Sequence, residues 1–382
     1  MNYAQLSLDE HRRLKGKLEI VSKAPLVTRD DLSTYYTPGI AAVSEAIAAD
    51  SEKSWEYTMR GNTVAVISDG SAVLGLGNIG AAAAQPVMAG KAVLFKEFAD
   101  IDAFPLVLDT QDTAEIIRTV RAVALNFGGI NLEDIAAPRC FEIEAVLQDL
   151  GIPVMHDDQH GTAVVVAAGL LNALRVVGKQ MKNCRIVING AGAAGTAIAQ
   201  LLGEQAKEIV VLDSKGIISL DRTDLNKEKQ KLAASTNPGK LNGSLTEALD
   251  GADVFIGVSK ANVLSAELAQ TMAKGAIVFA LANPVPEIMP DEAAAAGVAV
   301  IATGRSDFPN QVNNVLAFPG IFRGALDARA KRITPHMLQA AVQALASAIS
   351  EPTATCILPS PLDKTVAKAV AEAVKEAAKM AA

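Results

Sequence analysis

The chain has 382 residues, a hydrophobic fraction of 50% and a formal net charge of −7. This length exceeds one compact core and predicts two domains, and the acidic balance excludes a nucleic-acid partner, which would need a clustered basic face. Three widely spaced cysteines, a charged N-terminus without a signal-peptide core and an apolar stretch too short for a membrane span (residues 161–174) predict a cytoplasmic protein without a membrane partner.

Residues 1–158 are predicted to form a first α/β domain. The first 60 residues are expected to be mostly helical, with a turn forced at Pro38-Gly39. Strands and helices then alternate, which is the pattern of an α/β layer. Strands are expected over residues 63–70, 91–109, 129–135 and 152–155, and helices over 112–128 and 140–151, with a polar loop over 156–162.

The alternation restarts after residue 161 and predicts a second domain, over residues 159–320, with a doubly wound Rossmann-type fold for a dinucleotide. Helices are expected over residues 162–178, 191–205, 244–252 and 266–275, and strands over 185–190, 208–214, 254–259, 276–283 and 298–304. Residues 321–382 are mostly helical in pattern and are expected to pack back onto the first domain.

Two G-x-G-x-x-G motifs are present, at residues 75–80 and 190–195. In the second motif a strand runs into the first glycine, an uninterrupted helix follows the third, and the next strand ends on an acid. The glycines let the backbone approach a pyrophosphate at the helix N-terminus, and the acid accepts hydrogen bonds from the adenosine ribose. The predicted nucleotide-binding residues are Gly190, Gly192, Ala193, Ala194, Gly195 and Asp213.

The first motif has a weaker context. A turn separates it from the preceding strand, and Pro86 is expected to cut the following helix after about one turn. We interpret this motif as a tight strand-to-helix turn that positions the residues after it, above all Lys91.

Two acidic pairs, Glu133-Asp134 and Asp157-Asp158, follow short apolar runs. Both pairs are therefore expected at the carboxyl ends of strands, where α/β proteins place their ligands. Carboxylates without thiolates suit a hard cation such as Mg²⁺ or Mn²⁺, although each pair could also be a solvated turn or a helix cap. A zinc site at His156 and His160 is not favoured, because HExxH is absent.

Taken together, the motifs resemble those of the malic enzymes, and most closely the short bacterial members. The resemblance is carried in order by YYTPGIA, SDGSAVLGLGNIG, INLEDIAAP, HDDQHGTA, INGAGAAGTAIA, LDSKGII, LANPVPEI and TGRSDFPNQVNNVLAFPGIFRGALD, over nearly the whole chain. It implies oxidative decarboxylation of L-malate to pyruvate and CO₂ with NAD or NADP and a divalent cation, Mg²⁺ or Mn²⁺. It also implies that the first domain binds substrate and metal, and that the protein is a homodimer.

The resemblance also assigns roles to single residues. It implies that Tyr36 is the general acid, that Lys91 is the general base and that Asp157 is a neighbouring catalytic acid. The implied metal ligands are Glu133, Asp134 and Asp158, and the implied contacts to substrate or nicotinamide are Asn283 and Asn314.

Proton removal from the 2-hydroxyl of malate requires a neutral Lys91, whereas an ordinary lysine is protonated at neutral pH. Burial or a nearby Mg²⁺ is therefore expected to lower its pKa. Larger family members carry an arginine for a malate carboxylate where this chain has Ser71-Ala72-Val73. The metal, Asn314 or the main-chain amides of the first glycine motif are expected to replace it, the last as an anion-binding turn.

Several alternatives stay open at this point. Asp213 favours NAD over NADP because it would repel a 2′-phosphate, but Lys215 and Arg222 lie nearby in the sequence and could tolerate one. Rival activities are oxaloacetate decarboxylation, oxidation of another 2-hydroxy acid and an amino-acid dehydrogenase-like reaction. A nucleotide-binding regulator without activity is a further alternative. The first 50 residues are candidates for the dimer interface.

Overall fold

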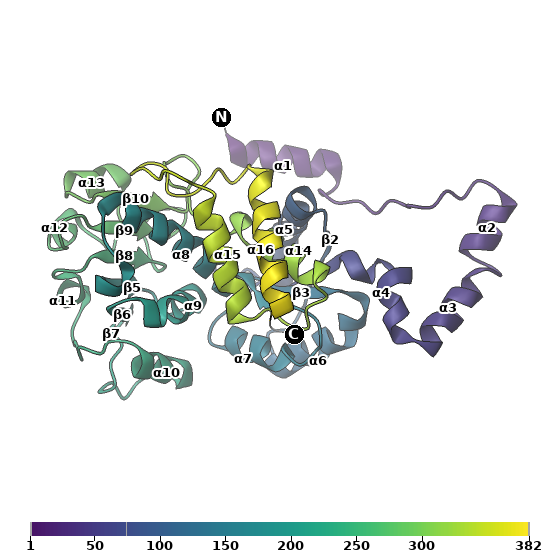
Figure 1. Cartoon of the computed structure of the whole chain (residues 1–382), viewed down its shortest axis with the longest axis horizontal. Helices are drawn as coiled ribbons and strands as arrows, with labels where there is room; N and C mark the ends of the chain where they lie inside the picture. The colour runs from purple at the N-terminus through teal and green to yellow at the C-terminus, as the bar shows by residue number, and fades with distance from the viewer. Residues whose placement is uncertain (1, 74, 381–382) are drawn as a thin grey trace.

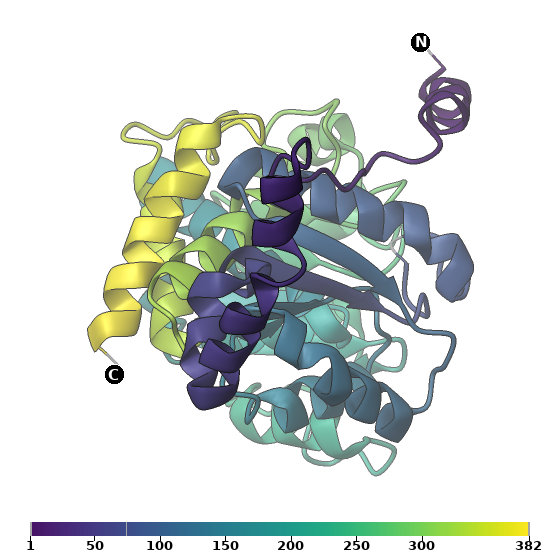
Figure 2. The ribbon, with the colours of Figure 1, turned by 90° about the vertical axis from the view of Figure 1, so that its right-hand side faces the viewer.

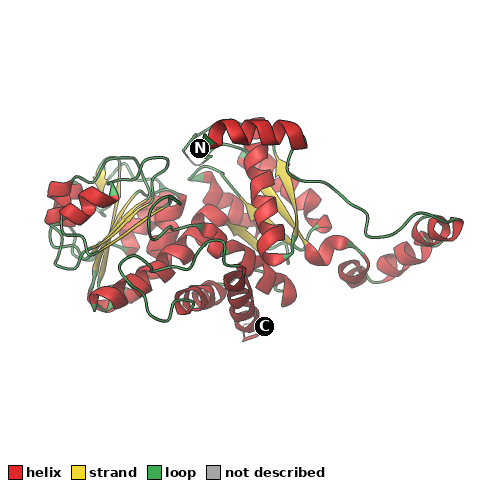
Figure 3. Ribbon diagram, turned by 90° about the horizontal axis from the view of Figure 1, so that it is seen from above, coloured by secondary structure: helices red, strands yellow, loops and turns green. Residues whose placement is uncertain are grey.

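The computed structural model describes residues 2–73 and 75–380 and contains two separate sheets, each flanked by helices (Figures 1 and 3). The first sheet has four parallel strands in the order β2-β1-β3-β4. Its strands are β1 (Thr63–Ser68), β2 (Asp102–Val107), β3 (Gly129–Leu132) and β4 (Val154–His156). β1 and β3 are buried along their whole length, as near-continuous apolar runs in a parallel sheet require.

The second sheet has the order β10-β9-β8-β5-β6-β7, and all of its pairs are parallel except β6 with β7. The order reverses at β5, which confirms the predicted doubly wound fold. The strands are β5 (Arg185–Asn189), β6 (Glu208–Asp213), β7 (Gly216–Ile217), β8 (Val254–Gly257), β9 (Ile277–Ala280) and β10 (Val300–Thr303).

Helices cover both sheets. Those of the first sheet are α5 (Ala81–Ala99), α6 (Thr113–Val123) and α7 (Arg139–Leu147). Those that follow are α8 (Asp157–Val177), α9 (Ala193–Leu202), α10 (Lys227–Ser235), α11 (Leu245–Leu249), α12 (Ala266–Gln270) and α13 (Pro290–Ala295). The C-terminal helices are α14 (Phe318–Asp327), α15 (Pro335–Ser347) and α16 (Lys364–Met380).

Helices α14 and α16 pack against α5, and α15 packs against α8 and α16. The ring of Phe95 on α5 meets the rings of Phe318 and Phe322 on α14 edge to face, with centroids 4.8 and 5.4 Å apart. Such aromatic contacts contribute about 0.5–1.5 kcal/mol beyond their buried area. The C-terminal helices therefore contact α5, which follows β1 of the first sheet, and α8, which connects the first sheet to the second.

Helix α8 forms much of the core between the two sheets. Among the described residues it is the helix long and apolar enough to cross a membrane, but 67% of its most apolar window is buried inside the protein. Its buried Asn172 donates hydrogen bonds to the carbonyls of Ala346 and Ile357, at 2.9 and 3.0 Å. These bonds tie α8 to the C-terminal region.

Two local expectations from the sequence are wrong. Pro86 does not end a helix: α5 continues through it to Ala99, so Lys91 lies on a helix rather than on a strand. The proline removes one backbone hydrogen bond, but the buried apolar face of α5 outweighs this loss. The polar segment after His156 is not a loop but the first turn of α8.

The N-terminal region contains α1 (Tyr3–Leu14), α2 (Arg29–Tyr35) and α3 (Ile40–Ala49), joined to the body by α4 (Ser54–Tyr57). It forms an arm whose helices α2 and α3 project from the body at the right of Figure 1, while α1 lies apart from them, above the body in that view. In the view of Figure 2, α2 and α3 stand in front of the first sheet. No residue of α1, α2 or α3 is buried, and apolar side chains of the arm are exposed, among them Val27 at 86%.

Candidate active site between the two sheets

A cavity of about 740 Å³ lies where the carboxyl ends of strands from both sheets face each other. Both glycine motifs line it, although they are more than 100 residues apart in the sequence. Predicted site residues in its lining are Asp158, Gly192, Ala193, Ala194, Asn283 and Asn314, beside Gly75 and Gly77 of the first motif. The two turns therefore serve one site.

The second motif has the geometry that its sequence predicts. β5 leads into Gly190, whose φ of +129° is open to glycine, and α9 begins at Ala193. A Cβ on Gly195 would collide with the carbonyl oxygen of Gly190, and a Cβ on Gly190 would lie 2.6 Å from the carbonyl oxygen of Val258. Glycine is thus required here for close packing of helix on strand.

Asp213 ends β6, next to the strand that carries the second motif, but it does not present a free carboxylate. Arg222 donates to it through two nitrogens at 2.8 and 3.1 Å, and Lys229 through Nζ at 2.6 Å. Burial would raise the pKa of Asp213, but these donors lower it to about 2. We call this group the basic cluster; its members are Asp213, Lys215, Arg222, Asp224 and Lys229.

The three predicted metal ligands lie together. Carboxylate oxygens of Glu133, Asp134 and Asp158 lie within 4.8 Å of one another. The register explains this, because Leu132 at the end of β3 pairs with His156 at the end of β4. The main-chain N–H of Asp134 also donates to the carboxylate of Asp158 at 2.8 Å.

Lys91 reaches the same place from α5. Its Nζ lies 2.5 Å from Oδ2 of Asp157 and 3.0 Å from Oε1 of Glu133, and the lysine is only 7% exposed. Asn314 donates a hydrogen bond from Nδ2 to the same oxygen of Asp157. The ring of Phe318 lies 4.0 Å beneath the ammonium. We call Lys91, Glu133, Asp134, Asp157 and Asp158 the acidic cluster.

The acidic cluster has little positive charge beside its carboxylates, since those of Asp157, Glu133 and Asp158 all act on the one ammonium of Lys91. Burial raises the pKa of Asp157 and of Asp158 to about 6, the latter helped by the charge of Asp157. Oδ1 of Asp157 is buried without a hydrogen-bond partner. Such a donor set fits a hard divalent cation.

The expected fall in the pKa of Lys91 does not occur in the protein alone. Burial lowers this pKa, but the charges of Asp157 and Glu133 outweigh burial and hold it above its usual value. The correction follows from the number of carboxylates around Lys91, which the sequence does not reveal.

Gly161 makes room for Asp157. A Cβ at Gly161, one helical turn after Asp157, would collide with the carboxylate of that aspartate. The glycine in HDDQHGT is therefore part of the site, although it offers no chemical group.

Tyr36 is the predicted site residue that the fold does not bring to the others. It follows α2 on the projecting arm, is 66% exposed and does not line the cavity. Tyr35 beside it is also exposed, at 49%.

Two supporting acids were not found from the sequence. Asp69 accepts hydrogen bonds from the main chain of Ser71 at 3.0 Å and from Nη2 of Arg139 at 2.9 Å, and so fixes the start of the first glycine turn. Its signal was present, because Asp before Gly commonly accepts from the backbone two residues on. Glu144 contacts the first turn of α8 from α7, and no local pattern marks it.

Comparisons with known proteins agree with this architecture. A family model described as "Malic enzyme, N-terminal domain" matches residues 15–148, and one described as "Malic enzyme, NAD binding domain" matches residues 159–379. The chain is 57% identical to the NAD-dependent malic enzyme of Geobacillus stearothermophilus, over 92% of this chain and 74% of that protein. It is 54% identical to the bifunctional malic/malolactic enzyme of Bacillus subtilis, over 96% of this chain and 91% of that protein. A crystal structure of the NAD-dependent malic enzyme of Thermotoga maritima superposes with a TM-score of 0.94 at 51% identity, covering 97% of this chain and 98% of that one.

Proposed function

The chain belongs to the malic enzyme family, and on this premise we propose that it oxidatively decarboxylates L-malate to pyruvate and CO₂, with reduction of NAD or NADP and with a divalent cation. The observation that carries the proposal is the acidic cluster, in which a buried lysine lies among carboxylates beside the cavity that the second glycine motif lines. A base, cation ligands and a nucleotide turn can thus act on one small substrate.

Glu133, Asp134 and Asp158 are the proposed ligands of Mg²⁺ or Mn²⁺. Their oxygens lie close enough to share one ion, and hard cations take carboxylate oxygens. When bound, the cation would polarise the oxygen of the forming ketone and of the enolate left by CO₂, while the nicotinamide would take up hydride.

Lys91 is the proposed general base for the 2-hydroxyl proton. Carboxylates that share their charge with a cation attract the ammonium less, so the pKa of Lys91 falls and its lone pair becomes available. Asp157 is the proposed group that takes the proton onward, and its contact with Nζ and its pKa of about 6 support this role. Asn314 orients that carboxylate.

Tyr36 is the proposed general acid that protonates C3 of enolpyruvate, supplied by a second copy of the chain. Its 66% exposure on an arm with exposed apolar side chains supports an arm that is covered in a homodimer. Two inactive variants test this: Tyr36→Phe and Lys91→Ala, mixed after reversible dissociation, should regain about a quarter of wild-type activity, since half of the dimers then hold one complete site. Mixtures that stay inactive would place both residues in one chain's site.

The first glycine motif is the proposed contact for a carboxylate of malate. Gly75 and Gly77 line the cavity opposite the second motif, and none of the described lining residues is Lys or Arg. Main-chain amides of a turn can bind an anion where a side-chain cation is missing. Those of Leu76 and Gly77 already donate to the carbonyl of Val73, so they would have to exchange this bond for one to malate. A structure with malate bound and no contact from residues 70–80 would remove this assignment.

The cations of the basic cluster affect the preference for NAD over NADP, because they compensate the charge of Asp213. Asp213 favours NAD by its position, yet Arg222 and Lys229 already neutralise it. We propose that the chain uses NAD and also accepts NADP, whose 2′-phosphate Arg222 could bind.

We also propose a cytoplasmic location. Cys140, Cys184 and Cys356 are all free thiols, and the first two are buried. Unpaired cysteines are the usual state in a reducing compartment.

The decisive experiment measures reduced nicotinamide by absorbance, with L-malate and Mn²⁺, in parallel with NAD and NADP. Turnover with pyruvate as product, abolished by EDTA, is the expected result. Product analysis separates pyruvate from lactate, which a malolactic reaction would yield. Oxaloacetate that loses CO₂ without malate oxidation would indicate a decarboxylase, and nucleotide binding without turnover an inactive regulator. Either result would overturn the proposal.

A further inference from the structure

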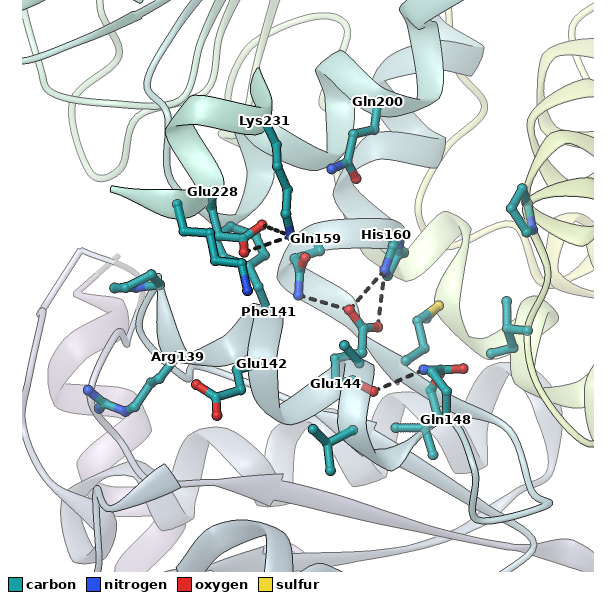
Figure 4. Close-up of a pocket in the computed structure, with 18 of the residues that line it drawn as sticks. Arg139, Phe141, Glu142, Glu144, Gln148, Gln159, His160, Gln200, Glu228 and Lys231 are labelled. Carbon is teal, nitrogen blue, oxygen red and sulfur yellow. Dashed lines mark hydrogen bonds and ion pairs between the residues drawn. The ribbon is translucent and has the colours of Figure 1, made fainter. Parts of the chain in front are cut away.

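The first turn of α8 carries Asp157 and Asp158, yet its own N-cap residue, His156, provides no side-chain cap. A side chain from another helix contacts this turn instead. Figure 4 shows Glu144 of α7 directed at the turn, with dashed lines to His160 and Gln159.

Glu144 makes three contacts with this turn. One carboxylate oxygen accepts the main-chain N–H of His156 at 2.8 Å. The other oxygen lies 3.0 Å from Nε2 of Gln159 and 3.1 Å from Nε2 of His160. The side chain is buried, and in the part of the chain that the structure describes its ion-pair partner is His160. The contacts of this carboxylate thus fall on one turn.

The contact with His160 lies on the face of the turn opposite Asp158, the proposed metal ligand that this turn carries, whereas Asp157 projects only about 60° from His160. Successive residues of a helix project about 100° apart, so Asp158 and His160 point in nearly opposite directions. Asp158 lines the cavity of the active site, whereas Gln159 and His160 line a separate cavity of about 830 Å³, shown in Figure 4. Because this second cavity replaces close packing on that face, hydrogen bonds to Glu144 hold the turn there.

The acidic cluster makes such a restraint necessary. Asp157 and Glu133 are buried, Asp158 lies beside them with its side chain 32% exposed, and their like charges repel one another. Ligand atoms need placement within about 0.5 Å to hold an ion well, so a side chain that holds this turn against the repulsion matters for the site.

We propose that Glu144 is a positioning residue that fixes the first turn of α8, so that Asp158 meets Asp134 and Asp157 meets Lys91 in a geometry ready for a divalent cation. The inference rests on the proposed function, because it concerns the same metal ligands. Glu144 acts through His156, Gln159 and His160, and does not touch the cation or the substrate.

The test measures Mn²⁺ binding directly, by the electron paramagnetic resonance signal of free Mn²⁺ titrated into the full chain. Glu144→Ala should weaken Mn²⁺ binding by about 10–100-fold, the range for residues that orient metal ligands. Glu144→Gln should have a smaller effect, because its amide oxygen can still accept the His156 N–H while its NH₂ faces two donors. Glu142→Gln is the matched control, since it lies on the same helix and lines the same cavity; it should bind Mn²⁺ as the wild type does.

Two further readouts separate positioning from a purely structural role. The melting temperature and the affinity for NADH, measured by nicotinamide fluorescence, should stay close to those of the wild type in Glu144→Gln, which keeps the volume of the side chain. Unchanged Mn²⁺ affinity in both Glu144 variants would refute the inference. So would a parallel loss of Mn²⁺ binding, NADH binding and melting temperature in Glu144→Gln. A wild-type chain that binds no Mn²⁺ would instead refute the proposed metal site, and the inference with it.

Discussion

The two charged clusters at the carboxyl ends of the two sheets have opposite balances. In the acidic cluster the carboxylates of Asp157 and Glu133 both contact Lys91, and the pKa of Asp157 rises to about 6. In the basic cluster three cations face two carboxylates, and the pKa of Asp213 falls to about 2. Burial opposes the charged form in both places; it prevails at Asp157, whereas the donors around Asp213 outweigh it.

This difference indicates what each cluster can bind. The acidic cluster is short of positive charge and buried, and a divalent cation would supply that charge. The basic cluster is partly open and keeps one cation in excess, and a phosphate could use it. Charge balance thus distinguishes two sites that otherwise share the same position in parallel sheets.

The largest expected effect comes from removing the ammonium of the acidic cluster. Lys91→Ala should lower kcat by about 10²–10⁴-fold, the usual contribution of a general base. Nucleotide affinity should stay as in the wild type, because the basic cluster is untouched. Lys96→Ala is the control, since Lys96 lies on the same helix but is 52% exposed; a similar loss of kcat in this control would discredit the assignment.

The next largest effect should appear in the binding of one ligand only, Mn²⁺, and not in the binding of NADH. Asp158→Asn should weaken Mn²⁺ binding by about 10²-fold, because it removes one of three charged ligands. NADH affinity should not change. Calorimetric titration of both ligands checks this, and a loss confined to NADH would contradict the assignment of the acidic cluster to the metal.

A third substitution, at Gly161, should act through a steric clash rather than through a change in charge. Gly161→Ala would push its methyl group into the carboxylate of Asp157 and displace it from Lys91. Overpacking of this kind costs about 1–3 kcal/mol, so we expect a lower kcat together with a lower melting temperature. Gly203→Ala would add a methyl group in open space at a glycine without positive φ, and it controls for the loss of a glycine without a clash. If Gly161→Ala kept full activity, the glycine would have no part in placing Asp157.

Much of this architecture follows from the sequence, because parallel strands leave strong signals. The apolar runs, the turn at Gly190–Gly195 and the register that joins Glu133 to Asp158 all follow from local patterns and from the rule that strand ends share an edge. The prediction that Pro86 ends a helix was wrong because burial of the apolar face of α5 outweighs one missing hydrogen bond.

Other features depend on contacts between distant segments. Arg222 and Lys229 reach Asp213 only once β7 and α10 have folded beside it, and nothing at Glu144 indicates that it will meet the start of α8. Tyr36 was expected in the site, yet the single chain leaves it on the exposed arm. Such contacts are set by tertiary packing, and in the case of Tyr36 we propose that they are set by a second chain.

A smaller effect should follow from changing the basic cluster. Arg222→Ala should raise the ratio of NAD to NADP use by about tenfold, because one charge-assisted contact to the 2′-phosphate is lost and Asp213 is left with less compensation. The ratio of kcat/KM values for the two nucleotides measures this. Lys227→Ala, an exposed change on the helix that also carries Lys229, should leave the ratio unchanged. An unchanged ratio in Arg222→Ala would remove the phosphate assignment.

The smallest effect concerns stability in acid. The pKa of Asp213 is about 2 in the folded chain and about 3.9 in an unfolded one, so its ion pairs contribute stability that is fully present above pH 3.9 or so and is lost as the pH falls towards 2. Asp213→Asn should therefore melt at a lower temperature than the wild type at neutral pH, and this difference should shrink below about pH 4. Asp221→Asn, an exposed change beside Arg222 in the loop after β7, should show no such pH-dependent difference. A difference for Asp213→Asn that stayed constant down to pH 3 would mean that loss of packing, rather than loss of the ion pairs with Arg222 and Lys229, destabilises the variant.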